Sequence, residues 1–385
     1  MLPALTWALL LVLLMATRTE QQHVVSKEEA LDFLHQMQNG QSCSDKTTYT
    51  MIEMNGWGGF ASQFQQVVAE WIRAAAHHDY KIPVLLTGHI RGYSDVKYCD
   101  HVNHDWTCYF LPMSDCHSQL MKSGIKVGYE FRTVNESVVP AKFAHMGLAW
   151  WWGIVHLYVF RLQPYVEAYV KSLAKNMENG EIFYTPRIVE PLVGIHVRHG
   201  DKASDGFKEH SLKAEMIAVK HSSECHLYDK NSLRFIKVGD LYDINDDNVV
   251  CSYTNSSYAF KPLKVFVASD DAAVLDTAKK LGHLVDSAGV SQQTSSVGML
   301  KTLVFHNPDI GFNASLEIIA DIFLLSQSST LVGIAASQVF RMAVDMSNSS
   351  GILKHAIIMD YGQLPRIQQL SIKYHVPLPE VFEHF

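Results

Sequence analysis

The stretch "VGIHVRHGDK" (residues 193–202) carries a short apolar run directly into a group of ionisable side chains. Val193, Ile195 and Val197 are apolar at alternate positions, which is typical of a buried strand. The ionisable residues that follow are His196, Arg198, His199, Asp201 and Lys202. Ligands of open α/β sheets bind beyond the carboxyl ends of the strands, so charged side chains placed here predict a binding site.

The sequence beyond this stretch alternates strands with helices. Apolar strands are predicted at residues 263–269, 330–335 and 355–360, and helices at 272–282, 316–329 and 337–347, the second of these amphipathic. Strands separated by helices are typical of a parallel sheet covered by helices on both faces. We therefore expect residues 186–385 to form an α/β domain.

Polar residues follow the other predicted strands as well. Asp270 and Asp271 come after the second strand, while Ser337 and Gln338 come after the third and begin a helix, whose first N–H groups can hold an anion. Arginine and lysine suit phosphate oxygens, and carboxylates accept hydrogen bonds from ribose hydroxyls or a base. The set predicts a site for a nucleoside diphosphate.

Each of these residues also has a structural interpretation. An acidic pair after a strand often caps a helix, an arginine at a strand end often forms a surface ion pair, and His196 alternates with apolar neighbours as a buried structural histidine does. The nucleotide hypothesis rests on all of them falling at one edge of one sheet.

The first half of the chain predicts a second α/β unit in residues 21–185. A helix is expected at residues 27–38 with Ser26 as its cap, followed by a strand, a glycine turn, a helix from about residue 60 and a strand at 82–88. A helical region at 147–175 is interrupted by Pro164. Its three tryptophans at 150–152 either pack a core or form a platform for sugars.

Composition limits the class of protein. The chain has 385 residues, of which 48% are hydrophobic and 18% charged, and its net charge of −7 argues against a general nucleic-acid binder. The sequence has no GxxxxGK[ST] loop and no CxxC pair, which argues against a P-loop NTPase and a structural zinc site. We expect no bound metal and no cofactor.

Several features point to the secretory pathway. Residues 1–16 are apolar and would span only about 24 Å as a helix, so residues 1–20 are interpreted as a cleaved signal, a signal-anchor in the membrane or a buried helix. Four glycosylation sequons begin at Asn135, Asn255, Asn313 and Asn348, and there are six cysteines. We expect a glycoprotein with disulfide bonds in the Golgi lumen or secreted.

The motifs, taken in order, resemble the α1,6-fucosyltransferases that modify the N-glycan core. "GIHVRHGDK" is similar to the "GVHVRRTDK" signature of that family, and "FVASDD" is similar to its "LATDD". The segments "GGFASQ", "FRLQPYVE" and "ADIFLLSQSSTLVGIAASQVFRMA" also resemble family segments in the same order. The fold that this implies is GT-B-like, with two Rossmann-type domains facing a cleft and the C-terminal one binding the nucleotide.

The resemblance implies a role for each matching residue. His196 and Arg198 would contact the β-phosphate of GDP-fucose, Asp321 the guanine, and Ser337 and Gln338 the phosphates. Gly59 and Phe60 would line the same cleft from the first domain, the acceptor side. Residues at positions required for activity in the family are Asp201, Lys202, Asp270 and Asp271, and with Arg198 we take Asp201 and Lys202 as catalytic.

The sequence departs from the family at several positions. His199 replaces the second arginine of the signature, and Gly206 replaces the glutamate that is the family's candidate base, for which Asp205 or Glu209 could substitute. The sequence ends at Phe385, and we expect neither the family's C-terminal SH3-like domain nor its coiled-coil stem.

The resemblance also implies disulfide pairings. Cys43 would pair with Cys116, Cys99 with Cys108, and Cys225 with Cys251. Two further bridges of the family are lost on both sides, because Gly58 and Ser62 occupy one pair of positions and Gly333 and Phe340 the other.

The sequence therefore predicts an inverting, metal-independent fucosyltransferase that transfers fucose from GDP-fucose to a glycan or glycoprotein. Two alternatives remain. One is a protein O-fucosyltransferase or a transferase of another GDP-sugar, and the other is a secreted glycan-binding or scaffold protein that kept the fold and lost the base.

Overall fold

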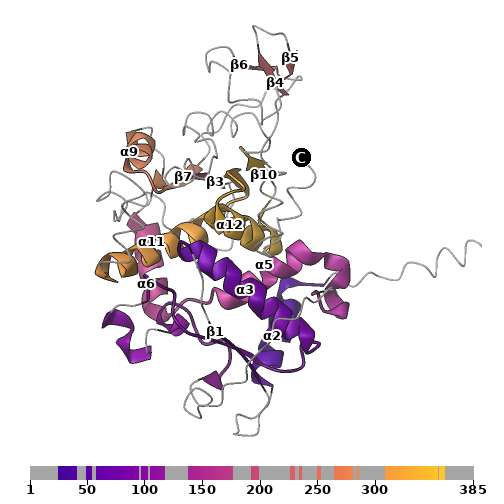
Figure 1. Ribbon diagram of the computed structural model, residues 1–385. Helices are drawn as coiled ribbons and strands as arrows, with labels where there is room; N and C mark the ends of the chain where they lie inside the picture. The colour runs from indigo at the N-terminus through magenta and orange to yellow at the C-terminus, as the bar shows by residue number, and fades with distance from the viewer. Residues whose placement is uncertain are drawn as a thin grey trace, which may run out of the picture.

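The structure is a computed structural model (Figure 1). It describes residues 25–40, 49–53, 58–94, 97–102, 105–117, 138–176, 192–198, 226–229, 234–235, 249–252, 264–280, 284–285, 308–353 and 355–359. Among these residues, no helix is both long and apolar enough to cross a bilayer. The predicted leader (residues 1–20) and the predicted domain boundary near residue 185 lie outside the described residues.

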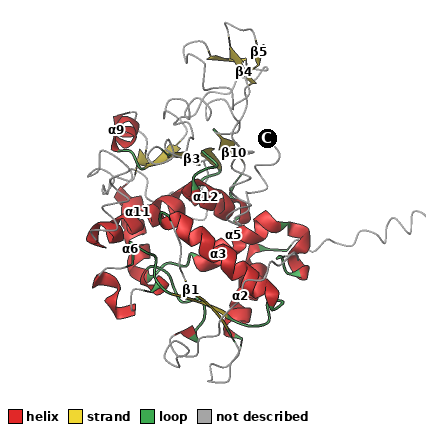
Figure 2. Ribbon diagram, in the orientation of Figure 1, coloured by secondary structure: helices red, strands yellow, loops and turns green. Residues whose placement is uncertain are grey.

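The first half of the chain is mainly helical around a short parallel strand pair (Figure 2). Its helices and strands are α2 (Lys27–Asn39), β1 (Thr50–Glu53), α3 (Phe60–His77), β2 (Val84–Thr87), α5 (Leu148–Val159) and α6 (Pro164–Asn176), with 3₁₀ turns η1 (Lys97–Val102), η2 (Trp106–Cys108) and η3 (Ala141–Met146). Strands β1 and β2 are parallel, with Thr50 opposite Val84. The predicted strand, glycine turn, helix and strand are confirmed.

The second half contains the parallel sheet that the sequence predicts. Its elements are β3 (Leu192–Val197), β7 (Lys264–Ser269), α9 (Ala272–Lys280), β8 (Leu284–Val285), α11 (Pro308–Ser326), β9 (Thr330–Gly333), α12 (Gln338–Ser349) and β10 (His355–Ile358). The strand order is β10-β9-β3-β7-β8, and every pair is parallel. Helix α9 packs against β7 and β8, and α11 packs against β3 and β7.

Helices α11 and α12 lie between this sheet and helices α3 and α5 of the first half (Figure 1). On α12, Met342 and Met346 pack into the core of the first half, while Phe340 and Val344 pack into the core of the sheet. Helix α11 likewise contributes to both cores. Two buried apolar faces explain why α11 is apolar over most of its surface, and the contacts of both helices join the two halves of the chain directly.

Local signals predict most helix boundaries. The Ser26 hydroxyl accepts a hydrogen bond from the Glu29 N–H at 3.1 Å, and Pro164 begins α6. Helix α11 differs from the prediction, since it begins two turns earlier at Pro308 and ends at Ser326 rather than Ser329. The sequence predicts an amphipathic helix there, but two apolar faces blur the period on which that prediction depends.

The sequence does not predict a small antiparallel sheet that the structure contains. It consists of β4 (His226–Asp229), β5 (Arg234–Phe235) and β6 (Val249–Ser252), in the order β5-β4-β6. These strands are short and lie among polar residues, so no apolar alternation marks them.

Candidate active site

The strand order creates a topological switch point beside β3. From β3 the chain proceeds through β7 and β8 on one side and then returns to β9 and β10 on the other. The crevice where the direction changes, at the carboxyl ends of β3 and β9, is where open α/β sheets bind ligands. His196 and Arg198 stand at the end of β3, and Ser337 and Gln338 follow β9.

Arg198 and Asp270 form an ion pair at this edge. The strands β3 and β7 run in register, with Val197 opposite Ser269, so the next residue of each strand lies beside the other. Arg198 Nη1 donates to Asp270 Oδ2. The side chains are 25% and 12% exposed, so the pair is partly shielded from water and still open on one side. The guanidinium is a planar group with five N–H donors, a geometry that matches phosphate oxygens.

His196 is buried in the sheet next to this pair. Burial lowers the pKa of His196 to about 3, and the positive charge of Arg198 contributes to the same lowering. The imidazole is therefore neutral at physiological pH. Its Nδ1 has no hydrogen-bond partner among the described residues. A buried polar atom without a partner is costly unless a ligand or water supplies one.

The start of α12 supplies the other side of the crevice. Ser337 is the N-cap, and its hydroxyl accepts from the Phe340 N–H at 3.5 Å. The Gln338 side chain is half-buried, and its Oε1 has no hydrogen-bond partner within the described part of the chain. Gln338 therefore presents an unused acceptor close to the positive end of the α12 dipole.

Asp271 has a local structural role. Its Oδ1 accepts from the Ala273 N–H at 2.8 Å, and its own N–H donates to Ser269 Oγ at 3.1 Å. This is the capping arrangement that an acidic residue before a helix predicts. The two acidic residues therefore have different roles: Asp270 forms an ion pair with Arg198, and Asp271 caps α9.

Asp321 lies on the part of α11 that packs toward the sheet. A Cβ on Gly194 would lie 2.6 Å from Ser328 Oγ and 3.0 Å from Leu325 Cδ2, so the end of α11 approaches β3 closely at this glycine. Asp321 precedes Leu325 by one turn and shares its helix face. Gly194 and His196 share the strand face that α11 covers.

The glycine turn before α3 places Gly59 and Phe60 differently. Gly59 is exposed and caps α3 without a side chain, whereas Phe60 is buried, so only its backbone can reach a ligand. Gly58 has a φ of +104°, which an L side chain rarely adopts.

Gln63 holds the glycine turn, a role that the sequence does not predict. Its Nε2 donates to the carbonyls of Gly58 and Arg91, both at 3.0 Å, and its Oε1 accepts from the Arg91 N–H at 3.0 Å. The contacts of this fully buried side chain reveal the role, and the sequence pattern alone does not. The turn is therefore fixed to the loop at Arg91.

Asp201 and Lys202, which we predicted to be catalytic, lie outside the described residues, as do Asp205, Gly206 and Glu209. In the described part of the chain, no three or more His, Cys, Asp or Glu side chains come close enough to hold a metal ion. Metal independence stays a prediction.

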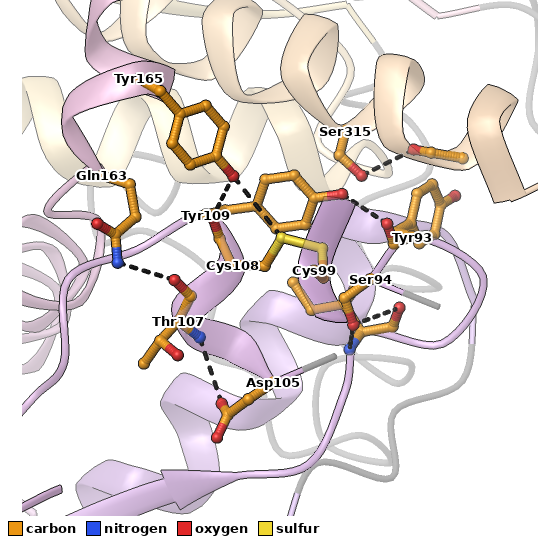
Figure 3. Close-up of a disulfide and its surroundings, with 12 residues drawn as sticks. Tyr93, Ser94, Cys99, Asp105, Thr107, Cys108, Tyr109, Gln163, Tyr165 and Ser315 are labelled. Carbon is orange, nitrogen blue, oxygen red and sulfur yellow. Dashed lines mark hydrogen bonds between the residues drawn. A yellow bond between two sulfur atoms is a disulfide. The ribbon is translucent and has the colours of Figure 1, made fainter. Parts of the chain in front are cut away.

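The disulfide between Cys99 and Cys108 is confirmed (Figure 3). Cys116 is also disulfide-bonded, and its predicted partner Cys43 lies outside the described residues, as does Cys225. The positions of the two lost bridges are in contact. A Cβ on Gly58 would lie 3.2 Å from Ser62 Cβ, and one on Gly333 would lie 2.7 Å from Phe340 Cδ2.

Comparison with known proteins supports the resemblance. No protein-family model matches the chain. Over 202 residues the chain is 26% identical to an alpha-(1,6)-fucosyltransferase of Drosophila melanogaster. The sequence is similar to an α1,6-fucosyltransferase. That similarity covers 52% of this chain and 25% of the fly enzyme, so the chain spans about a quarter of the relative's length.

Solved structures of the fucosyltransferase NodZ also match. A crystal of NodZ alpha-1,6-fucosyltransferase soaked with GDP-fucose gives a TM-score of 0.42 and 14% identity, over 78% of this chain and 93% of NodZ. A crystal structure of NodZ from Bradyrhizobium gives a TM-score of 0.41 and 15% identity, over 77% of this chain and 92% of that NodZ chain. TM-scores this low do not establish a common fold, so the α/β class rests on the parallel strand order of the chain itself.

Proposed function

We propose that this chain is a fucosyltransferase that uses GDP-fucose and transfers fucose to a glycan with inversion and without a metal ion. The observation that carries the proposal is the group at the topological switch point. Arg198 is held there by Asp270, His196 is neutral with an unpartnered Nδ1 among the described residues, and α12 begins with Ser337 and Gln338. This group combines a cation, neutral polar atoms and a helix N-terminus, which suits a diphosphate.

In the proposed reaction, an acceptor hydroxyl attacks the anomeric carbon of fucose as the bond to the β-phosphate oxygen breaks. The electron pair of that bond leaves with GDP, and a carboxylate takes the hydroxyl proton. Arg198, with Lys202, stabilises the negative charge that grows on the diphosphate. Asp205 and Glu209 are the candidates for the base.

Asp270 acts in this proposal as a positioning residue. It occupies one guanidinium nitrogen of Arg198 and fixes the direction of the others. Preorganised donors contribute more to charge stabilisation than mobile ones, because little reorganisation is left for the reaction itself. The same pairing keeps the partly buried Arg198 charge neutralised before the donor binds.

The remaining parts of the proposal concern the donor and the compartment. Asp321 recognises the guanine, and a GT-B-like arrangement places the exposed Gly59 turn across the cleft from the switch point. The Cys99–Cys108 disulfide and the sequons support a Golgi or secreted protein, because disulfides persist in oxidising compartments.

The test is release of GDP from GDP-fucose by the full chain, measured with a panel of glycan and glycoprotein acceptors, in chelator and in manganese. We expect acceptor-dependent release that chelator does not abolish. GDP binding that requires manganese would refute metal independence. Glycan binding without any binding of GDP would favour the non-catalytic alternative.

A further inference from the structure

Exposed aromatic rings gather on the first half of the chain. Among the described residues, the large apolar side chains that are exposed are Tyr98 (52%), Tyr165 (42%) and Leu111 (36%). Both tyrosines stack against Phe312, with ring centroids 4.7 Å from Tyr98 and 6.5 Å from Tyr165. We call Tyr98, Phe312 and Tyr165 the aromatic platform. They come from η1, α11 and α6, so only the folded chain assembles them.

The platform is rigid. Tyr98 precedes Cys99, which is bonded to Cys108, and the Tyr165 hydroxyl donates to the Cys108 carbonyl (Figure 3). Burial of that hydroxyl raises the pKa of Tyr165 to about 12, so it stays protonated and remains a donor. Both exposed tyrosines are thus held in place by contacts at one disulfide. A ligand that stacks on them therefore loses little binding free energy to the ordering of protein side chains.

The size of the platform favours a small ligand over a protein. Two tyrosine residues that are each exposed by about half offer about 200 Å² in total. A stable protein interface needs about 800 Å² from each partner, about four times as much. A sugar ring fits this area, and its face of C–H groups packs on the electron-rich face of an aromatic ring. The Lys97 ammonium lies 5.4 Å from the centre of the Tyr98 ring and can donate to sugar hydroxyls there.

The platform is connected to the glycine turn of the candidate site through buried aromatic rings. Phe312 stacks on buried Tyr109 at 5.6 Å, and Tyr109 packs edge-on against Phe60 at 6.0 Å. Phe60 directly follows Gly59. On the other side, a Cβ on Gly311 would lie 2.0 Å from the Gly92 carbonyl oxygen, so the start of α11 is seated on the loop beside the turn.

We propose that the aromatic platform stacks a sugar ring of the acceptor glycan, at a distance from the hydroxyl that receives fucose. This inference rests on the proposed function, because it takes the glycan as the acceptor. It adds a binding surface formed by Tyr98, Phe312 and Tyr165 to a site that the sequence assigns to other residues.

The experiment measures binding of two free oligosaccharides to the full chain by calorimetry: a biantennary N-glycan and maltoheptaose. We expect at least one to bind, and Tyr98→Ala to weaken its affinity about tenfold. Tyr98→Phe keeps the ring and should restore the affinity. Leu111→Ala truncates another exposed apolar side chain, outside the platform, and should change nothing.

Binding that is equal in Tyr98→Ala and the natural chain overturns the inference, and so does a failure of both oligosaccharides to bind. The Asn313→Gln variant is tested in parallel, because Asn313 begins a sequon next to Phe312. If an added glycan binds only in that variant, the chain's own glycan occupies the platform, and the acceptor assignment is overturned.

Titration with GDP on the same samples separates this inference from the proposed function. Tyr98-dependent glycan binding without GDP binding would uphold the sugar surface and refute the transferase. GDP binding and transfer with a Tyr98-independent acceptor KM would uphold the transferase and refute the platform. The natural chain and the Tyr98 and Leu111 variants should bind GDP equally, since both residues lie outside the switch point.

Discussion

Arg198 and Asp270 form an ion pair across the carboxyl ends of two adjacent parallel strands. The partners are 72 residues apart in the sequence, and the register of β3 and β7 alone brings them together. The pair reconciles the two interpretations that the sequence left open. A partly exposed ion pair is what a structural arginine would form, and it is also what would hold a phosphate-binding guanidinium in place.

The Arg198→Lys variant separates these interpretations. We expect the fold to be kept and turnover to fall about a hundredfold, which corresponds to about 3 kcal/mol of lost transition-state stabilisation. Lysine keeps the charge but not the planar fork. Turnover with GDP-fucose and thermal unfolding are measured on the same protein. A purely structural pair predicts normal turnover and at most about 1 kcal/mol of lost stability.

A matched control for that variant is Arg73→Lys. Arg73 pairs with Glu70 at 3.1 Å on α3, away from the switch point. We expect turnover to stay normal. An equal loss of turnover in both variants would mean that the effect of Arg198→Lys arises from general destabilisation.

Asp271 gives a prediction about stability. Because its Oδ1 caps α9, we expect Asp271→Ala to lower the free energy of unfolding by about 1 kcal/mol and Asp271→Ser, which keeps a cap, to lower it by a few tenths. Urea denaturation measures both. Equal losses would contradict the capping role. A stable Asp271→Ser protein with weakened GDP affinity would give Asp271 the donor-binding role that its position after the strand predicts.

The role of Asp321 is tested by comparing the affinities of a variant for two ligands. We expect Asp321→Asn to weaken binding of GDP far more than binding of inorganic diphosphate, because a carboxylate accepts two hydrogen bonds from guanine and an amide does not. Calorimetric titration with each ligand measures this. Equal losses for the two would make Asp321 a structural residue of α11.

The buried pair His156 and Asp345 predicts a pH dependence of stability. Their Nδ1 and Oδ2 atoms lie 3.6 Å apart between α5 and α12. Burial lowers the pKa of His156 from 6.5 to about 3. Burial also raises the pKa of Asp345 well above 3.8, against the opposing effect of Arg341. Burial therefore favours the uncharged form of each group in the folded chain.

The two groups have opposite effects on stability. As pH falls from 6.5 to about 3, the unfolded chain gains a proton on His156 that the folded chain does not, so stability falls. As pH rises above 3.8, the unfolded chain loses the Asp345 proton that the folded chain keeps, so stability also falls. Between pH 3.8 and pH 6.5, a rise in pH increases stability through His156 and decreases it through Asp345.

Asp345→Asn removes only the second effect. We expect the variant to gain stability relative to the natural chain as pH rises, by up to about 1.4 kcal/mol per pH unit until the folded-state pKa of Asp345 is reached. Denaturation midpoints at about pH 5 and about pH 7.5 measure this, since both lie above the unfolded-state pKa of an aspartate. A relative stability of Asp345→Asn that declines as pH rises would contradict the raised pKa of Asp345.

The sequence by itself determined most of the helices, the main strands of the parallel sheet and the edge of that sheet at which the candidate site lies. Ser26 and Pro164 mark helix starts because capping and proline act within one turn. Short apolar runs predict β3, β7 and β9, because the strands of a parallel sheet covered by helices are buried on both faces. Parallel strands bring their carboxyl ends to one edge, so the order of residues along the chain is enough to place Arg198, Asp270 and Ser337 there.

Only the tertiary structure decided what each of those side chains does. It paired Arg198 with Asp270, gave Asp271 to the cap of α9, buried Phe60 and left Nδ1 of His196 without a partner among the described residues. It also gave α11 and α12 a second apolar face and assembled the aromatic platform from three distant segments. These outcomes depend on which residues meet across the fold, and local pattern carries no information about packing between segments that lie far apart in the chain.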